Sequence, residues 1–220
     1  MRTWAFVSQK GGSGKSTLST QLAVYAGEMG EVVCLLDLDE QASSMLWSGV
    51  REETEPTVLP AKPEHMAAVI EQAPKLGATM MILDTAPHTS AGALAAIRAA
   101  DLIICPTKPS LLDIGALQDT VRLLDLSGQR DKAVVVVNQI LPHGIRATFD
   151  DAADNIRRMG LRVCKNFIGN RQAFIEAINR GKGVTEIAKA DKSASEIRAL
   201  WAELVAMSAA NTKSREKVKA

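Results

Sequence analysis

A glycine-rich segment near the start of the chain has the composition of a phosphate-binding loop. Ser8–Thr17 reads SQKGGSGKST and directly follows a short apolar run, Thr3–Val7. Gly11, Gly12 and Gly14 carry no Cβ, so the backbone N–H groups can approach phosphate oxygens closely. The helix expected after the loop adds the N–H groups of its first turn, which also favour anions. The sequence therefore predicts a phosphate-binding loop between a strand and a helix.

The polar residues of this loop predict a magnesium–nucleotide site. We expect Lys15 to reach the β- and γ-phosphates and the hydroxyl of Ser16 to ligate Mg²⁺. Lys10 has no place in the usual pattern G-x-x-x-x-G-K-[ST], which also has glycine where this chain has Gln9. The second lysine therefore needs an explanation of its own.

Five segments make the chain resemble the ParA/MinD ATPases. KGGSGKST resembles the deviant Walker A motif of that family, KGGxGK[ST], and CLLDLDEQAS (residues 34–43) resembles its second-strand segment. MMILDTAP (80–87) is similar to the Walker B strand, and CPTKPSLLDIGAL (105–117) to the proline-containing segment after the fourth strand. IGNRQAFIEAINRGKGVTEIA (168–188) looks most like small ParA-type plasmid or chromosome partition ATPases.

The resemblance implies roles for the lysines and aspartates. In such proteins two subunits enclose two ATP molecules, and Lys10 of each would contact the phosphates bound by the other. It implies that Asp39 orients the attacking water or the metal shell and that Asp84 holds Mg²⁺. We therefore expect a catalytic set of Lys10, Lys15 and Asp39, with Asp37 in support, and a metal set of Ser16, Asp39 and Asp84. The expected nucleotide-binding residues are Lys10, Gly11, Gly12, Ser13, Gly14, Lys15, Ser16, Thr17 and Asn138. Asn138 has an alternative interpretation, in which it caps a turn at the end of its strand.

The C-terminal part of the chain has a basic composition. Residues 1–156 contain 12 Lys/Arg and 19 Asp/Glu, whereas residues 157–220 contain 14 and 6. Such asymmetry indicates a polyanionic partner or, alternatively, only solvated helix faces. ParA-like proteins bind DNA without sequence preference, and a dimer would double the phosphate contacts. We expect Arg171, Arg180 and Lys182 to contact DNA.

The apolar pattern predicts an α/β fold with a mostly parallel, twisted sheet. Continuous apolar runs at 3–7, 32–36, 79–83, 102–105, 133–137 and 161–164 read as buried strands separated by helices. The expected architecture is a three-layer P-loop NTPase fold with helices on both faces of the sheet. Residues 51–64 read as a surface connection. A capping box of Ser193 and Glu196 is expected to begin the last helix. The expected domains are a single ATPase domain at 1–210 and a basic, disordered tail at 211–220.

Taken together, these features predict a cytoplasmic, nucleoid-associated ATPase that uses ATP and Mg²⁺ and hydrolyses ATP slowly without a partner. The expected partners are a second copy in the ATP state, non-specific DNA and a ParB-like centromere-binding adaptor, and the expected task is plasmid or chromosome segregation. The alternative is a MinD-like ATPase that acts on a membrane or positions a protein cluster. A stable membrane association is not expected, because the last ten residues contain only Val218 and Ala220 as apolar residues. The three cysteines are expected to be buried thiols.

Overall fold

The computed structural model describes residues 1–87 and 90–219, and it contains one seven-stranded sheet in which every pairing is parallel. The strand order is β3-β2-β4-β1-β5-β6-β7. The strands are β1 (Arg2–Phe6), β2 (Val33–Leu38), β3 (Thr57–Pro60), β4 (Met80–Thr85), β5 (Leu102–Thr107), β6 (Ala133–Val137) and β7 (Arg162–Val163).

Strand β3 is absent from the sequence prediction, which treated residues 51–64 as a surface connection. That prediction was wrong, because Cys34–Asp37 of β2 pair with Thr57–Pro60. The strand lies at the edge of the sheet and is mostly exposed, so it has no continuous apolar run. Its proline is tolerated because an edge strand leaves one row of backbone groups unpaired. The other six strands lie close to their predicted positions.

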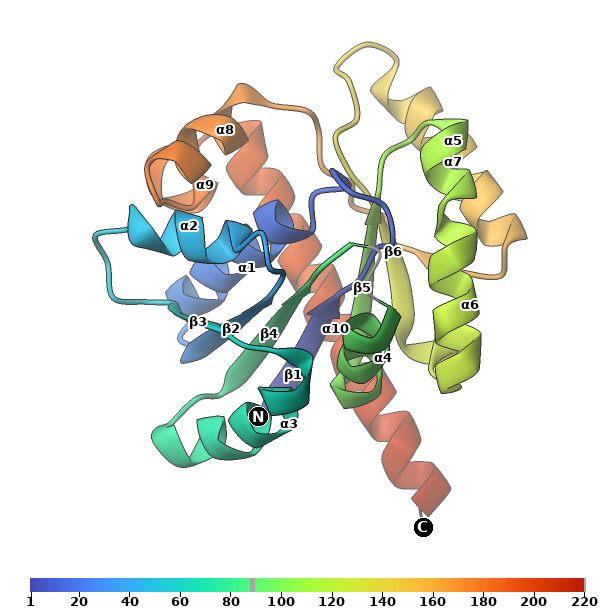
Figure 1. Cartoon of the computed structure of the whole chain (residues 1–220). Helices are drawn as coiled ribbons and strands as arrows, with labels where there is room; N and C mark the ends of the chain where they lie inside the picture. The colour runs from blue at the N-terminus through green and yellow to red at the C-terminus, as the bar shows by residue number, and fades with distance from the viewer. Residues whose placement is uncertain (88–89, 220) are drawn as a thin grey trace.

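Helices cover both faces of the sheet, as Figure 1 shows. They are α1 (Lys15–Glu28), α2 (Ser43–Gly49), α3 (Pro63–Gln72), α4 (Ser90–Ala99), α5 (Leu111–Gly115), α6 (Leu117–Ser127), α7 (Ile145–Arg158), α8 (Gln172–Asn179), α9 (Val184–Ile187) and α10 (Lys192–Lys219). Two short 3₁₀ helices, η1 (Ala73–Leu76) and η2 (Arg130–Lys132), complete the described structure.

Alternation along the strands divides the core between the two faces. Trp4 and Phe6 of β1 lie in the cluster that also contains α1, α8, α9 and α10. Ala5 and Val7 lie in the opposite cluster, with the buried residues of α3, α4, α5, α6 and α7. Successive residues of a strand point to opposite faces, so a strand buried on both sides is apolar throughout. The predicted three-layer α/β architecture is confirmed.

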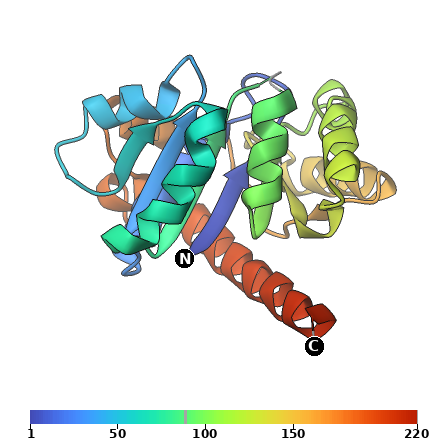
Figure 2. The ribbon, with the colours of Figure 1, turned by 60° about the horizontal axis from the view of Figure 1, so that its bottom comes forward.

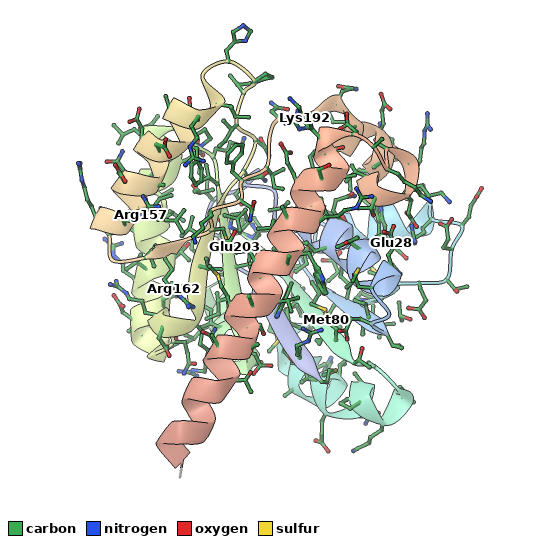
Figure 3. All side chains as sticks on the ribbon, turned by 180° about the vertical axis from the view of Figure 1, so that it is seen from behind. Glu28, Met80, Arg157, Arg162, Lys192 and Glu203 are labelled. Carbon is green, nitrogen blue, oxygen red and sulfur yellow. The ribbon has the colours of Figure 1, made fainter. Side chains whose placement is uncertain are left out.

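The last helix, α10, packs along the back of the sheet (Figure 3). Ile197, Leu200, Trp201 and Leu204 of α10 are buried, and the ring centroids of Trp201 and Trp4 are 5.1 Å apart. The capping box was wrong. Asp191 accepts the backbone N–H of Ser193 at 2.7 Å, and Glu196 binds Arg171 instead. Aspartate one residue before the helix is itself a good cap, so it takes the position that the pattern assigned to Ser193.

Helix α10 also extends past the sheet, as Figure 2 shows. Its backbone is helical to Lys219, so the boundary expected at residue 210 does not coincide with the end of the helix. Lys, Glu, Arg and Ala favour helical backbone, and the division into an ATPase domain and a disordered tail stays a prediction.

The carboxyl ends of β1, β2 and β4 meet at one edge of the sheet, beside the phosphate loop and the segment that carries Asp39. Asp84 of β4 is in register with Phe6 of β1 and with Asp37 of β2. Strands β4 and β2 lie on one side of β1, and β5 lies on its other side, so the order of the strands reverses direction at β1. Open parallel sheets bind ligands at such a switch point. No helix in the described ranges is both long and apolar enough to cross a bilayer.

Candidate functional site

The loop between β1 and α1 has a backbone that only glycine adopts easily. Gly12 and Gly14 have φ values of +71° and +97°, and Gly14 immediately precedes α1. A Cβ on Gly14 would lie 2.1 Å from Nδ2 of Asn138. That amide in turn donates to the carbonyl of Ser13 at 2.9 Å. The loop is therefore held open by a side chain that fits only because Gly14 has none.

Lys15 lies inside this loop. Its side chain is buried, and Nζ donates to the carbonyl of Ser8 at 3.2 Å. Burial lowers the pKa of Lys15, while the negative charges of Asp84 and Asp39 oppose that effect. The ammonium is therefore directed into the loop where the sequence predicted phosphate.

Asp84 is completely buried at the end of β4. Ser44 donates its hydroxyl to Oδ2 of Asp84 at 2.7 Å, and Oδ1 is buried without a hydrogen-bond partner. Burial raises the pKa of Asp84 to about 6, which the charge of Asp37 reinforces and Ser44, Ser16 and Lys15 oppose. An unpartnered carboxylate oxygen beside a serine hydroxyl suits a hard divalent cation.

The two aspartates after β2 have different environments. Asp37 is buried, and its carboxylate accepts the backbone N–H groups of Asp39 and Met45 at 3.1 and 3.0 Å. Asp37 therefore holds the turn that carries Asp39. Asp39 is half-buried and lines the phosphate pocket. The structure thus separates Asp37, which holds the turn, from Asp39, which lines the pocket.

The pocket at the loop has a volume of about 280 Å³. It brings together the predicted residues Gly11, Gly12, Gly14, Lys15, Ser16, Thr17 and Asp39. The neighbouring Ser13 hydroxyl is buried without a partner. Together with Oδ1 of Asp84, this hydroxyl leaves one donor and one acceptor available for a phosphate and its cation, so the residues present fit a magnesium nucleotide. Thr20, Ser43, Trp47, Pro87 and Ile178 complete the lining and were not predicted.

Lys10 lies outside this pocket. Its Nζ contacts Oδ1 of Asp113, on α5, at 2.5 Å, and its side chain is 41% exposed. The residues that line the phosphate pocket include Lys15 but not Lys10. The two lysines therefore have different partners: Lys15 donates to the carbonyl of Ser8, whereas Lys10 pairs with Asp113 on α5.

A second pocket of about 290 Å³ adjoins the first around the start of α1. Asn138, Gln139, Asn170 and Phe174 are among its lining residues. Asn138 donates to Ser13 and accepts the N–H of Gln139, so both ends of its amide are used within the chain. These bonds match the turn-capping alternative, and a contact with a base stays a prediction. Asn170 and Phe174 lie in the segment 168–188 quoted for the family resemblance, which gave them no role, and Gln139 lies outside every quoted segment.

The three residues predicted to bind DNA have different surroundings. Arg171 forms a two-bond pair with Glu196 at 2.5 and 3.0 Å and lines the second pocket. Lys182 is paired with Glu53, and its side chain is 22% exposed. Arg180 is exposed at the end of α8. In Figure 3, Arg157 and Arg162 lie on the α7 side, away from Lys192 beside α8 and α9. The basic residues of the C-terminal third therefore do not form one surface.

Comparison with known proteins gives the site a family context. The sequence profile of the CobQ/CobB/MinD/ParA nucleotide binding domain matches residues 4–184. The chain is 30% identical over 209 residues to the maintenance of carboxysome distribution protein A of Gloeobacter kilaueensis. This match covers 86% of this chain and 90% of that protein. It is 31% identical over 137 residues to the chromosome-partitioning ATPase Soj of Thermus thermophilus, covering 49% and 55%.

Solved structures share the fold. The MinD cell division protein of Aquifex aeolicus superposes with a TM-score of 0.77 at 18% identity, over 94% of this chain and 97% of that one. Apo McdA of Cyanothece gives 0.71 at 17% identity, over 94% and 99%. MinD of Pyrococcus horikoshii, in complex with Mg-ADP, gives 0.72 at 19% identity, over 91% and 94%. ATP and Mg²⁺ accordingly fit the phosphate loop described above.

Proposed function

Because the chain belongs to the CobQ/CobB/MinD/ParA family and is an ATPase of the ParA/MinD type, we propose that ATP closes two copies into a dimer that binds DNA. Repeated closure, hydrolysis and release would segregate plasmid or chromosomal DNA, with a ParB-like adaptor stimulating hydrolysis. The protein would then act in the cytoplasm, on the nucleoid.

The position of Lys10 carries this proposal. Its ammonium pairs with Asp113, its side chain is 41% exposed, and Lys10 is not among the residues that line the phosphate pocket. Two facing triphosphates repel one another, so a cation donated from each side stabilises the closed pair by charge-assisted hydrogen bonds. An arginine finger supplied in trans uses the same electrostatics. Lys10 is available for such a contact, whereas Lys15 is committed to its own loop.

Apolar residues beside this ion pair support a face-to-face contact. Leu111 and Leu112, the first two residues of α5, are 75% and 81% exposed. They directly precede Asp113, which binds Lys10. Exposed leucines next to the transferable lysine would be covered by the same closure.

The hydrolytic chemistry would depend on positioning and charge. Mg²⁺, held by Ser16, Asp84 and the shell around Asp39, would neutralise charge on the phosphates. Lys15 would hold the phosphates of its own subunit, and Asp39 would orient the attacking water. Since the arrangement is completed only by a second subunit, we expect slow hydrolysis by the protein alone and stimulation by an adaptor.

The DNA surface would lie around the loop between α8 and α9. Arg180, Lys182, Lys189 and Lys192 come from this region, and dimerisation would place two such surfaces together. Each phosphate contact releases counterions. Doubling the number of contacts therefore raises the affinity for DNA and makes that affinity fall more steeply with salt concentration.

A second candidate is the positioning of a protein cluster. Two relatives named for carboxysome distribution match 86% and 92% of this chain, whereas Soj and the ParA of Rhizobium radiobacter match 49% and 58%. The ATP cycle and the DNA surface would be the same, and only the cargo would differ. A third candidate, a membrane-bound cycle of the MinD kind, would give ATP-dependent binding to anionic vesicles rather than to DNA.

The decisive experiment is sedimentation velocity with Mg²⁺ and a slowly hydrolysed ATP analogue. We expect wild type to become dimeric and Lys10→Ala to stay monomeric while binding the analogue with unchanged affinity. Lys15→Ala is the matched control, since it should lose nucleotide binding itself. A Lys10→Ala protein that dimerises like wild type would show that the lysine does not act across the interface.

A further inference from the structure

A third lysine lies at the phosphate loop. Lys108 follows the last residue of β5 and is separated from α5 by Pro109 and Ser110. A side chain placed on Gly12 would begin 3.8 Å from Nζ of Lys108. The ammonium therefore lies next to the loop, although Lys108 comes from a separate part of the chain.

Lys108 does not line the phosphate pocket of its own subunit, although Gly12 does. Lys10 contacts Asp113 next to the same loop, and the charge of Lys108 acts on that carboxylate as well. Two lysines and one aspartate thus gather outside the pocket, on the face that closure would cover.

The carboxylate of Asp113 is shared within this group. It contacts Nζ of Lys10 at 2.5 Å and accepts the hydroxyl of Ser110 at 2.5 Å, and its side chain is 14% exposed. Burial alone would raise the pKa of Asp113, but the bonds from Lys10 and Ser110 and the charges of Lys10 and Lys108 lower it overall. Both lysines therefore stabilise the ionised carboxylate.

Transfer of Lys10 to the facing phosphates would leave the charge of Asp113 without its ion-pair partner. The carboxylate would lose its nearest cation at the moment when the interface removes water from it. An unpaired charge that becomes buried is strongly destabilising. Lys108 lies beside Gly12, does not line the phosphate pocket, and already acts on the carboxylate of Asp113 through its charge.

We propose that Lys108 is a positioning residue that replaces Lys10 as the cation of Asp113 when Lys10 crosses to the partner. The inference rests on the proposed ATP-dependent dimer and deepens it. Lys108 would contact neither nucleotide nor reacting atoms, and it would act by lowering the cost of releasing Lys10.

The test compares the full-length variants Lys108→Gln, Asp113→Asn and the double variant, with Lys108→Arg as the conservative control. Mg-ADP binding to the monomer is titrated, and the dimer dissociation constant is measured by sedimentation with Mg²⁺ and the slowly hydrolysed analogue. We expect unchanged ADP affinity throughout, which also shows that each variant folds. Lys108→Gln should raise the dimer dissociation constant about tenfold or more, and Lys108→Arg should not.

The double variant decides between mechanisms. Without a charge on residue 113, the loss of Lys108 should have no further effect, so the double variant should dimerise like Asp113→Asn. A defect of Lys108→Gln that persists in the Asp113→Asn background would instead indicate direct contact with nucleotide and overturn the inference. A normal Lys108→Gln dimer would overturn it too. Wild type that stays monomeric would overturn the proposed dimer itself, and the inference with it.

Discussion

At the scale of single residues, the site keeps charged groups in surroundings that oppose their charge. Lys15 is buried with its pKa lowered, and Asp84 is buried with its pKa raised to about 6. Both shifts arise first from burial, and each group partly relieves the other. Such strain is expected where a protein prepares a site for a charged ligand, because the ligand supplies the missing partner.

Asp84→Asn tests this strain. The folded-state pKa of Asp84 lies above its ordinary value of 3.8, so its contribution to stability is greatest at acid pH and is lost as pH rises toward about 6. Removing the charge should therefore raise the free energy of unfolding at pH 7 by about 3 kcal/mol, since two pKa units correspond to about that much. Mg²⁺-dependent ATP hydrolysis should be lost.

The measurement is urea unfolding of the nucleotide-free protein between pH 4 and pH 8. The gain of Asp84→Asn over wild type should shrink toward zero at the acid end, where Asp84 is protonated. A variant that is less stable than wild type at pH 7 would contradict a strained carboxylate.

At the scale of elements, two helices next to the phosphate loop are tied to the loop between α8 and α9. Trp47 of α2 and Gln21 of α1 both donate to the carbonyl of Lys182, at 3.4 and 3.2 Å. Arg51, after α2, binds the carbonyl of Gly181 at 2.7 Å and Glu186 at 2.9 and 3.0 Å. A change at the phosphate loop can therefore reach the basic segment through direct hydrogen bonds.

Arg51→Ala should cost about 3 kcal/mol of folding free energy, because Glu186 and the carbonyls of Gly181 and Glu55 lose the guanidinium that binds them. The guanidinium is 5% exposed and lies over the ring of Trp47. The matched control is Arg146→Ala, whose ion pair with Asp150 is 73% and 53% exposed and should change stability by less than about 0.5 kcal/mol. Equal losses in urea unfolding would contradict the role given to Arg51.

Helix α5 offers a second prediction at this scale. Leu112→Ser should weaken the ATP-dependent dimer at least about tenfold, because each copy would bury a leucine there and burial of one is worth about 2 kcal/mol. Leu76→Ser is the control, since Leu76 is 84% exposed on η1. Sedimentation with the ATP analogue measures both, and equal dimerisation would remove α5 from the interface.

At the scale of the whole molecule, nucleotide-dependent DNA binding is the expected output. Wild type should retard duplex DNA with ATP but not with ADP, and affinity should fall steeply with salt. Arg180→Ala should reduce the slope of log affinity against log salt by about 2, one phosphate contact from each copy. Arg157→Ala is the control, because Arg157 pairs with Asp154 on the α7 side. Equal salt slopes for both variants would move the DNA surface elsewhere.

The sequence by itself determined the parallel sheet, the position of the phosphate loop and the aspartates at its edge. Buried parallel strands are apolar on both faces, and a loop that approaches phosphate needs glycine. Both features depend on residues that are neighbours in the chain, so a local pattern is enough to predict them. The tertiary structure decided the rest. It joined segments that are distant in the chain. Examples are the pairing of the edge strand β3, the ion pair of Lys10 with Asp113, the position of Lys108 next to Gly12, and the ion pair of Arg171 with Glu196. Which distant segments meet depends on strand order and packing, and a local pattern of residue types does not contain that information.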